Sequence, residues 1–229
     1  MPPPFTGSPV MPLDFERARF NMVEQQVRPW EVLDPRVLDV LREVRREEYV
    51  PARWRKLAFA DVALPLEHGE VMMKPVVEGR MLQALAVKPE DAILEVGTGS
   101  GFITACLARL GREVRSVEIH GGLAERARAR LAGAGLGNVT VEAADALGSF
   151  DPGRTYDCVC VTGAVAVEPE RFRRWLAPGG RLFLIHGLSP AMEASLATRG
   201  PDSQYVTTSL FETDVPYLVG AAPLPRFVL

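Results

Sequence analysis

AILEVGTGSGFITACLARLG, residues 92–111, decides the fold of this chain of 229 residues. An apolar run typical of a buried strand leads into three alternating glycines, Gly97, Gly99 and Gly101, and then into an amphipathic helix that ends at Gly111. Glycines allow a tight turn and let a ligand approach the backbone closely. Ligands bind beyond the carboxyl ends of the strands in an open parallel sheet, so this loop predicts a ligand site.

Strand and helix patterns alternate on both sides of this loop. Because parallel strands need crossover helices, the alternation predicts an α/β fold with a mostly parallel, doubly wound, Rossmann-like sheet. Helices are expected over residues 15–27, from the N-cap Asp34 onward and over 76–87, with a long connecting segment over 57–75. Residues 205–218 and 225–229 read as antiparallel edge strands. The stretch LFETDVPYL, 210–218, could line a pocket or complete the sheet, and its pattern favours the sheet.

We expect a disordered or extended tail over residues 1–13 and a single domain over 14–229. Within it, residues 14–90 would form the N-terminal helices and an active-site loop, 91–190 the cofactor-binding core, and 191–229 the edge strands.

The composition excludes several classes of partner. Apolar residues make up 47% of the chain and the net charge is −3, so nucleic acid is not expected. No apolar run reaches the roughly 18 residues that span a bilayer, and the N-terminus lacks a signal-peptide pattern. Three cysteines without a C-x-x-C pair, and scattered histidines, argue against disulfides and a metal site. We therefore expect a cytoplasmic protein.

The spacing around the glycine loop narrows the choice of ligand. A dinucleotide fingerprint would need a glycine where Phe102 stands, and the Gly-Lys-Ser/Thr ending of a P-loop is absent. Glu118 ends the next strand, about twenty residues on, where an acid accepts hydrogen bonds from ribose hydroxyls. Asp145 ends the third strand and could lie near an adenine or cap the following turn. These residues describe a pocket for a nucleoside without pyrophosphate, and S-adenosylmethionine fits it best.

Several motifs resemble one family. LEVGTGSGFITACLARL followed by VRSVEI resembles the cofactor region of the protein-L-isoaspartate O-methyltransferases. The resemblance extends to DPRVLDVLREVRREEYVP (34–51), AFADVALPL (58–66), YDCVCVTGAV (156–165) and LAPGGRLFLIHG (176–187), and so covers roughly residues 20–190.

The resemblance implies an S-adenosylmethionine-dependent methyltransferase that esterifies L-isoaspartyl residues of damaged proteins or peptides, for repair. The glycine loop would line the cofactor, Glu118 would hold the ribose and Asp145 would lie by the adenine, although Ala144 and Ala146 replace the family's glycines around that acid. The predicted cofactor-binding residues are Glu95, Gly97, Thr98, Gly99, Ser100, Glu118, Ile119 and Asp145.

The chain departs from the family in GEVMMKP, residues 69–75. The family has Gly-Gln-Thr-Ile-Ser-x-Pro there, so Val71 and Met73 replace two hydroxyl residues. Isoaspartyl transfer could survive, because an ionised carboxylate needs positioning rather than a general base. Alternatively, the chain methylates another carboxylate or small molecule, or binds the cofactor without catalysis. No catalytic residue is assigned. The predicted substrate-loop residues are Gly69, Val71, Met72, Met73 and Pro75.

Overall fold

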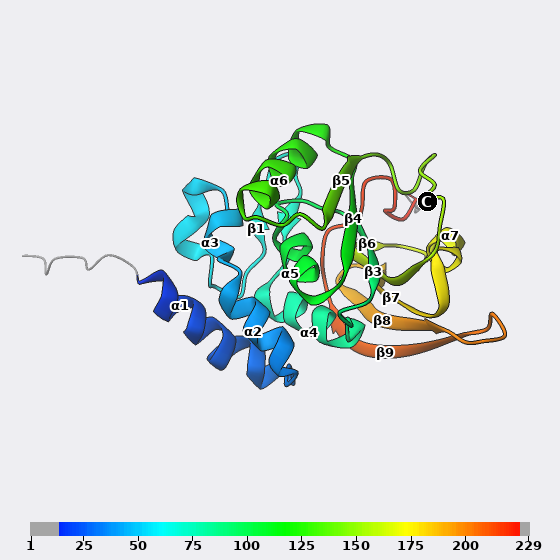
Figure 1. Cartoon of the computed structure of the whole chain (residues 1–229), viewed down its shortest axis with the longest axis horizontal. Helices are drawn as coiled ribbons and strands as arrows, with labels where there is room; N and C mark the ends of the chain where they lie inside the picture. The colour runs from blue at the N-terminus through cyan, green and yellow to red at the C-terminus, as the bar shows by residue number, and fades with distance from the viewer. Residues whose placement is uncertain (1–13, 225–229) are drawn as a thin grey trace, which may run out of the picture.

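A seven-stranded sheet organises the computed structural model, which describes residues 14–224 (Figure 1). The expected tail, 1–13, and the expected last strand, 225–229, lie outside these residues. The strand order across the sheet is β5-β4-β3-β6-β7-β8-β9. Neighbouring strands from β5 to β7 are parallel, whereas β8 is antiparallel to both β7 and β9. The predicted doubly wound sheet with antiparallel edge strands is therefore confirmed. The strands are β3 Ala92–Val96, β4 Glu113–Glu118, β5 Val139–Ala143, β6 Tyr156–Val165, β7 Leu176–Leu188, β8 Ala191–Arg199 and β9 Tyr205–Thr213.

Helices cover both faces of the sheet, which is why every residue of β3 is buried. Ile93 belongs to a large core beneath the N-terminal helices, α4 (Pro75–Leu85) and α5 (Phe102–Leu110). The next residue, Leu94, belongs to a second core that contains Phe172 of α7 (Glu170–Arg174). Figure 1 shows α7 on the opposite side of the sheet from α4 and α5. Helix α6, Gly121–Gly133, connects β4 to β5.

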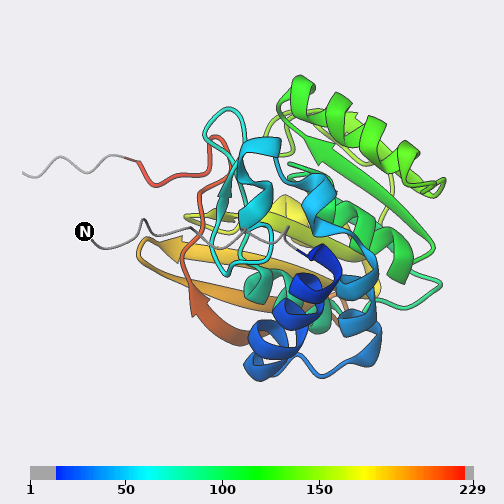
Figure 2. The same ribbon diagram turned by 90° about the vertical axis from the view of Figure 1, so that its left-hand side faces the viewer.

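The N-terminal helices pack together beside the sheet (Figure 2). As predicted, Asp34 caps α2, because its carboxylate accepts a hydrogen bond of 2.8 Å from the Arg36 amide. The segments are α1 Phe15–Met22, the π-helical η1 Val23–Val27, the 3₁₀ turn η2 Arg28–Trp30, α2 Pro35–Glu43, α3 Arg46–Tyr49 and the 3₁₀ helix η3 Ala52–Leu57. None of the helices within residues 14–224 has the length and apolar character needed to cross a bilayer.

The connecting segment 57–75 contains a short antiparallel hairpin. Its strands, β1 (Leu64–Pro65) and β2 (Val71–Met72), are two residues each, too short for any sequence period to indicate. The hairpin carries the predicted substrate loop to the start of α4 at Pro75.

Candidate active site

A pocket opens at the carboxyl ends of β3, β4, β5 and β6, where the glycine loop leaves the sheet. Its empty space, counted together with the open mouth, is about 710 Å³. The lining residues are Glu70, Val71, Met73, Val96, Gly97, Gly99, Val117, Glu118, Ile119, Ala144, Asp145, Ala146, Leu147, Thr162, Gly163, Val215, Pro216, Tyr217, Leu218 and Val219. A smaller adjoining pocket adds Met72, Glu78, Thr98, Ser100, Phe102 and Ile103.

The backbone conformation at position 97 and a neighbouring side chain both require a glycine there. Gly97 has a φ of +96°, and a Cβ there would lie 2.4 Å from the Thr162 hydroxyl oxygen. That hydroxyl donates to the Gly97 carbonyl at 2.5 Å, so β6 holds the loop against β3. Only glycine fits this position.

Glu118 lies where a ribose-binding acid is expected. Its carboxylate is buried at the end of β4 and lines the pocket. The Gly99 and His120 amides donate to its two oxygens at 2.8 Å and 3.0 Å, which fixes the carboxylate beside the glycine loop. A carboxylate oxygen has more than one lone pair, so each oxygen can still accept from a ligand hydroxyl.

Asp145 caps a turn, as one of the two predictions for it requires, and it also lines the pocket. One of its oxygens accepts from the Leu147 amide at 2.8 Å, which caps the turn after β5. The residue also lines the pocket between Ala144 and Ala146, with the half-exposed Ile119 nearby on the lining. This end of the pocket is apolar apart from the carboxylate, as suits a flat heterocycle.

Glu95 is not among the residues that line either pocket. It is fully buried behind the loop, where the Thr104 and Ser116 hydroxyls donate to one carboxylate oxygen at 2.5 Å. Ser116 in turn contacts the Thr98 hydroxyl at 2.5 Å, so the network supports the loop from beneath. The other carboxylate oxygen has no partner among the described residues, and burial raises the pKa of Glu95 to about 7 despite the two hydrogen bonds.

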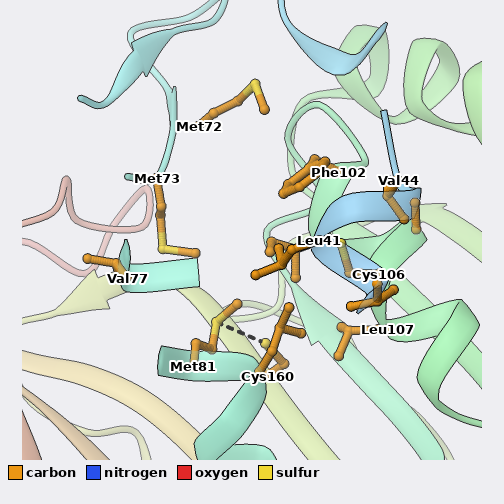
Figure 3. Packing of buried hydrophobic residues seen from close by; sticks show 14 of the residues in the cluster. Leu41, Val44, Met72, Met73, Val77, Met81, Phe102, Cys106, Leu107 and Cys160 are labelled. Atoms are coloured by element: carbon orange, nitrogen blue, oxygen red, sulfur yellow. Dashed lines mark hydrogen bonds between the residues drawn. The ribbon is translucent and has the colours of Figure 1, made fainter. Parts of the chain in front are cut away.

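Three residues of the predicted substrate loop line the pockets. Val71 and Met73 line both the main and the smaller pocket, and Met72 lines the smaller one. Gly69 lies in the hairpin turn with a φ of +82°, and Pro75 is the first residue of α4; neither is among the residues that line these two pockets. Met72 and Met73 are also buried packing residues of the large core (Figure 3).

Two of the described residues that line the main pocket, Thr162 and Tyr217, carry a hydroxyl group. Both hydroxyl groups form hydrogen bonds with backbone atoms. Thr162 bonds to the glycine loop, while the Tyr217 hydroxyl donates to the Gly187 carbonyl at 3.0 Å and accepts from the Ser189 amide at 3.1 Å. Among residues 14–224, the lining contains three carboxylates and no lysine, arginine or histidine. An anionic acceptor therefore meets no cation within this lining.

Arg46 fixes the substrate loop from below, a role that the sequence did not indicate. Its guanidinium is fully buried, forms an ion pair with Glu78 and donates to the carbonyls of Ala58 and Met73 at 2.8 Å each. It also lies 4.7 Å from the Phe102 ring centroid, at the start of α5. Burial raises the pKa of Glu78 to about 7, and the neighbouring guanidinium opposes this rise.

The stretch LFETDVPYL serves both of the roles considered for it. Its first part belongs to β9, and its second part, with Val219, lines the pocket. Ala164 at the end of β6 holds this second part, because its amide donates to the Pro216 carbonyl at 2.9 Å and its carbonyl accepts from the Leu218 amide at 2.8 Å. The expectation that this stretch only completes the sheet was too narrow.

Comparison with known proteins gives one consistent result. The family model described as protein-L-isoaspartate(D-aspartate) O-methyltransferase matches residues 18–213. Protein-L-isoaspartate O-methyltransferase 1 of Rhodopseudomonas palustris is 39% identical over 170 residues, covering 74% of this chain and 69% of the relative. The Methylorubrum populi protein-L-isoaspartate O-methyltransferase is 36% identical over 188 residues, covering 82% and 88%.

Solved structures share the fold. A Plasmodium falciparum structure assigned as a protein-L-isoaspartate O-methyltransferase, in complex with S-adenosyl-L-homocysteine, superposes with a TM-score of 0.76 at 17% identity, covering 87% of this chain and 97% of that one. A second structure, of a protein-L-isoaspartate O-methyltransferase, gives a TM-score of 0.74 at 22% identity and covers 90% and 66%.

Proposed function

Because the chain belongs to the protein-L-isoaspartate O-methyltransferase family, we propose that it transfers the methyl group of S-adenosylmethionine to the side-chain carboxylate of L-isoaspartyl residues in damaged proteins. The observation that carries the proposal is the extent of the family match, which runs from α1 to the end of β9 and includes the glycine loop, Glu118 and the substrate loop. We also propose a cytoplasmic location, which the three buried, unpaired cysteines favour.

The pocket fits the nucleoside part of this cofactor. Glu118 would accept hydrogen bonds from the ribose hydroxyls, and Asp145 would face the adenine edge beside Ala144 and Ala146. The glycine at position 97 supports this fit, since a side chain there would strike Thr162 and displace the loop. When bound, the cofactor supplies an electrophilic methyl group on a cationic sulfur.

The protein's own contribution to transfer is positioning. A side-chain carboxylate is ionised near neutral pH, so no residue has to remove a proton from it. Val71 and Met73 would exclude water from the side where the acceptor enters, and Arg46 would fix that wall through the Met73 carbonyl. Holding two reactants in line can by itself supply a large part of a rate enhancement.

The missing hydroxyls predict weak catalysis. Hydrogen bonds from a threonine and a serine would orient the acceptor carboxylate, and their absence costs on the order of 1 to 3 kcal/mol of orienting free energy. Within the described part of the chain, no cation on the lining replaces them.

The direct test uses labelled cofactor with an isoaspartyl peptide and its normal aspartyl counterpart. We expect methyl transfer to the isoaspartyl peptide alone, and faster transfer with Val71→Thr combined with Met73→Ser. Equal labelling of the two peptides, or none, would reject isoaspartyl transfer.

A second candidate function is methylation of another, less anionic acceptor. The apolar wall of Val71 and Met73 and the three carboxylates of the lining favour it, because both disfavour an unpartnered anion. A screen of neutral and carboxylate-bearing small molecules tests it, and a neutral acceptor that outpaces the isoaspartyl peptide would support it. Tight cofactor binding with no product from any acceptor would instead indicate a protein that binds the cofactor without catalysis.

A further inference from the structure

The turn of the β1–β2 hairpin is attached to the corner between β4 and α6. His68 in the turn stacks on His120, with ring centroids 4.3 Å apart and planes 8° from parallel. Glu70 at the end of the turn lies 3.1 Å from the His120 Nε2. We call these three residues, His68, Glu70 and His120, the histidine cluster. Figure 1 shows the hairpin beside α6.

The backbone of the turn is strained, and the histidine cluster holds it in this conformation. His68 has a φ of +60° and Gly69 one of +82°, so two consecutive residues are left-handed. A residue with a side chain avoids this conformation, and it persists only where the surroundings hold it. The stacking of His68 on His120 is such a restraint.

His120 connects the turn to the cofactor side of the pocket. Its amide donates at 3.0 Å to the carboxylate of Glu118, the proposed ribose ligand, while its ring contacts the turn. The Glu118 carboxylate also accepts from the Gly99 amide. One residue therefore contacts both the cofactor-binding carboxylate and the hairpin.

The hairpin forms the opposite side of the pocket. Glu70 lines the pocket directly, and Val71 and Met73 follow it on the proposed acceptor wall. Leu66, at the other end of the turn, lies over the glycine loop, since a Cβ on Gly99 would be 3.3 Å from the Leu66 Cδ1. The position of the turn thus sets the position of the acceptor wall relative to the cofactor.

We propose that His120 is a positioning residue that couples cofactor binding to the order of the acceptor wall. A ribose bound by Glu118 restrains the corner between β4 and α6, and the histidine cluster transmits this restraint to the hairpin turn. This inference rests on the proposed function for the identity of the cofactor. Ordering of one site by a ligand at another is measurable as slower amide exchange.

Two amides report on the turn. The Leu66 amide donates to the Glu70 carbonyl at 2.8 Å, and the Glu70 amide donates to the Glu67 carbonyl at 3.1 Å, so both exchange only when the turn opens. S-adenosylhomocysteine should slow their exchange in the wild-type protein by about fivefold or more. No methyl acceptor is needed for this measurement.

His120→Ala is the decisive variant, because it removes both the ring that stacks on His68 and the contact with Glu70 but keeps the backbone bond to Glu118. It should bind S-adenosylhomocysteine with near wild-type affinity while the cofactor no longer slows exchange at the turn. Its kcat should fall without a matching rise of KM for the cofactor. Glu70→Gln retains a hydrogen-bond acceptor for His120 and should keep the coupling, whereas Glu70→Leu should weaken it.

Arg126→Gln is the matched control. It removes an ion pair of 2.6 Å between the same turn and α6, through Glu67, but both partners are largely exposed, and such pairs contribute little. Coupling should survive in this variant.

Cofactor-dependent slowing that persists in His120→Ala would overturn the inference and leave the proposed function intact. A wild-type protein that is folded but does not bind S-adenosylhomocysteine would overturn both.

Discussion

Replacement of Gly97 by alanine should expose how tightly β6 holds the glycine loop. The left-handed φ of +96° costs an alanine about 1 to 2 kcal/mol. The new Cβ would also lie 2.4 Å from the Thr162 Oγ1, and forcing an atom into a packed site typically costs about 1 to 3 kcal/mol more. Gly97→Ala should therefore lower the free energy of unfolding by about 2 to 5 kcal/mol.

Gly179→Ala separates the two contributions. Gly179 also has a positive φ, of +76°, but no atom of the described residues lies within 4 Å of the place that an alanine Cβ would take, so only the backbone cost applies. Urea unfolding should show that Gly97→Ala is the more destabilising variant by the steric contribution, about 1 to 3 kcal/mol.

Thr162→Ala should rescue Gly97→Ala. It removes the oxygen that the new methyl group strikes, and the next atoms, the Leu218 Cδ2 at 3.7 Å and the Thr162 Cβ at 3.8 Å, are at ordinary contact distances. The double variant should recover most of the steric contribution, which a double-mutant cycle measures. Equal destabilisation by the two glycine substitutions, or an additive cycle, would refute this account of the loop.

Three further outcomes follow from the site. Glu118→Gln should weaken S-adenosylhomocysteine binding about tenfold to a few hundredfold in calorimetry, because charge-assisted hydrogen bonds are lost. Glu142→Gln on the neighbouring strand should leave the affinity unchanged. The pKa of Glu95 is raised from 4.5 to about 7, so between these values the folded state keeps a proton that the unfolded chain has released. Unfolding free energy should thus fall as the pH rises through this window, by up to about 3 kcal/mol, and less in Glu95→Gln. Arg46→Met should lower the unfolding free energy by about 3 to 5 kcal/mol, because Glu78 is left buried without its partner. Adding Glu78→Met should recover much of this loss in denaturant titrations, and no recovery would contradict the explanation.

The sequence predicted the fold well because local signals and the global architecture agree. The cap at Asp34, the glycine that ends α5 and the apolar run of β3 each favour the same layered structure. The positions of Gly97 and Glu118 in the pocket follow from the rule for strand ends in parallel sheets.

The missed parts of the site depend on contacts between distant residues. Arg46 reads as one charge in an arginine-rich helix, and only packing shows that it is buried beneath the substrate loop. Thr162 lies on β6, whose pattern indicates a strand but not that its hydroxyl meets the glycine loop. Glu95 illustrates the converse, since an acid next to the glycines in sequence lies behind them in space.

The contribution of residues 215–219 to the pocket has a consequence for synthesis and quality control. During translation, the glycine loop emerges more than a hundred residues before the wall that Tyr217 and Leu218 provide, so a nascent chain can form much of the sheet and still lack a finished ligand site. A product that stops at residue 214 should then gain little thermal protection from S-adenosylhomocysteine, whereas the finished protein gains it by mass action. Ligand-induced protection would thus distinguish finished from prematurely terminated molecules in a cell extract.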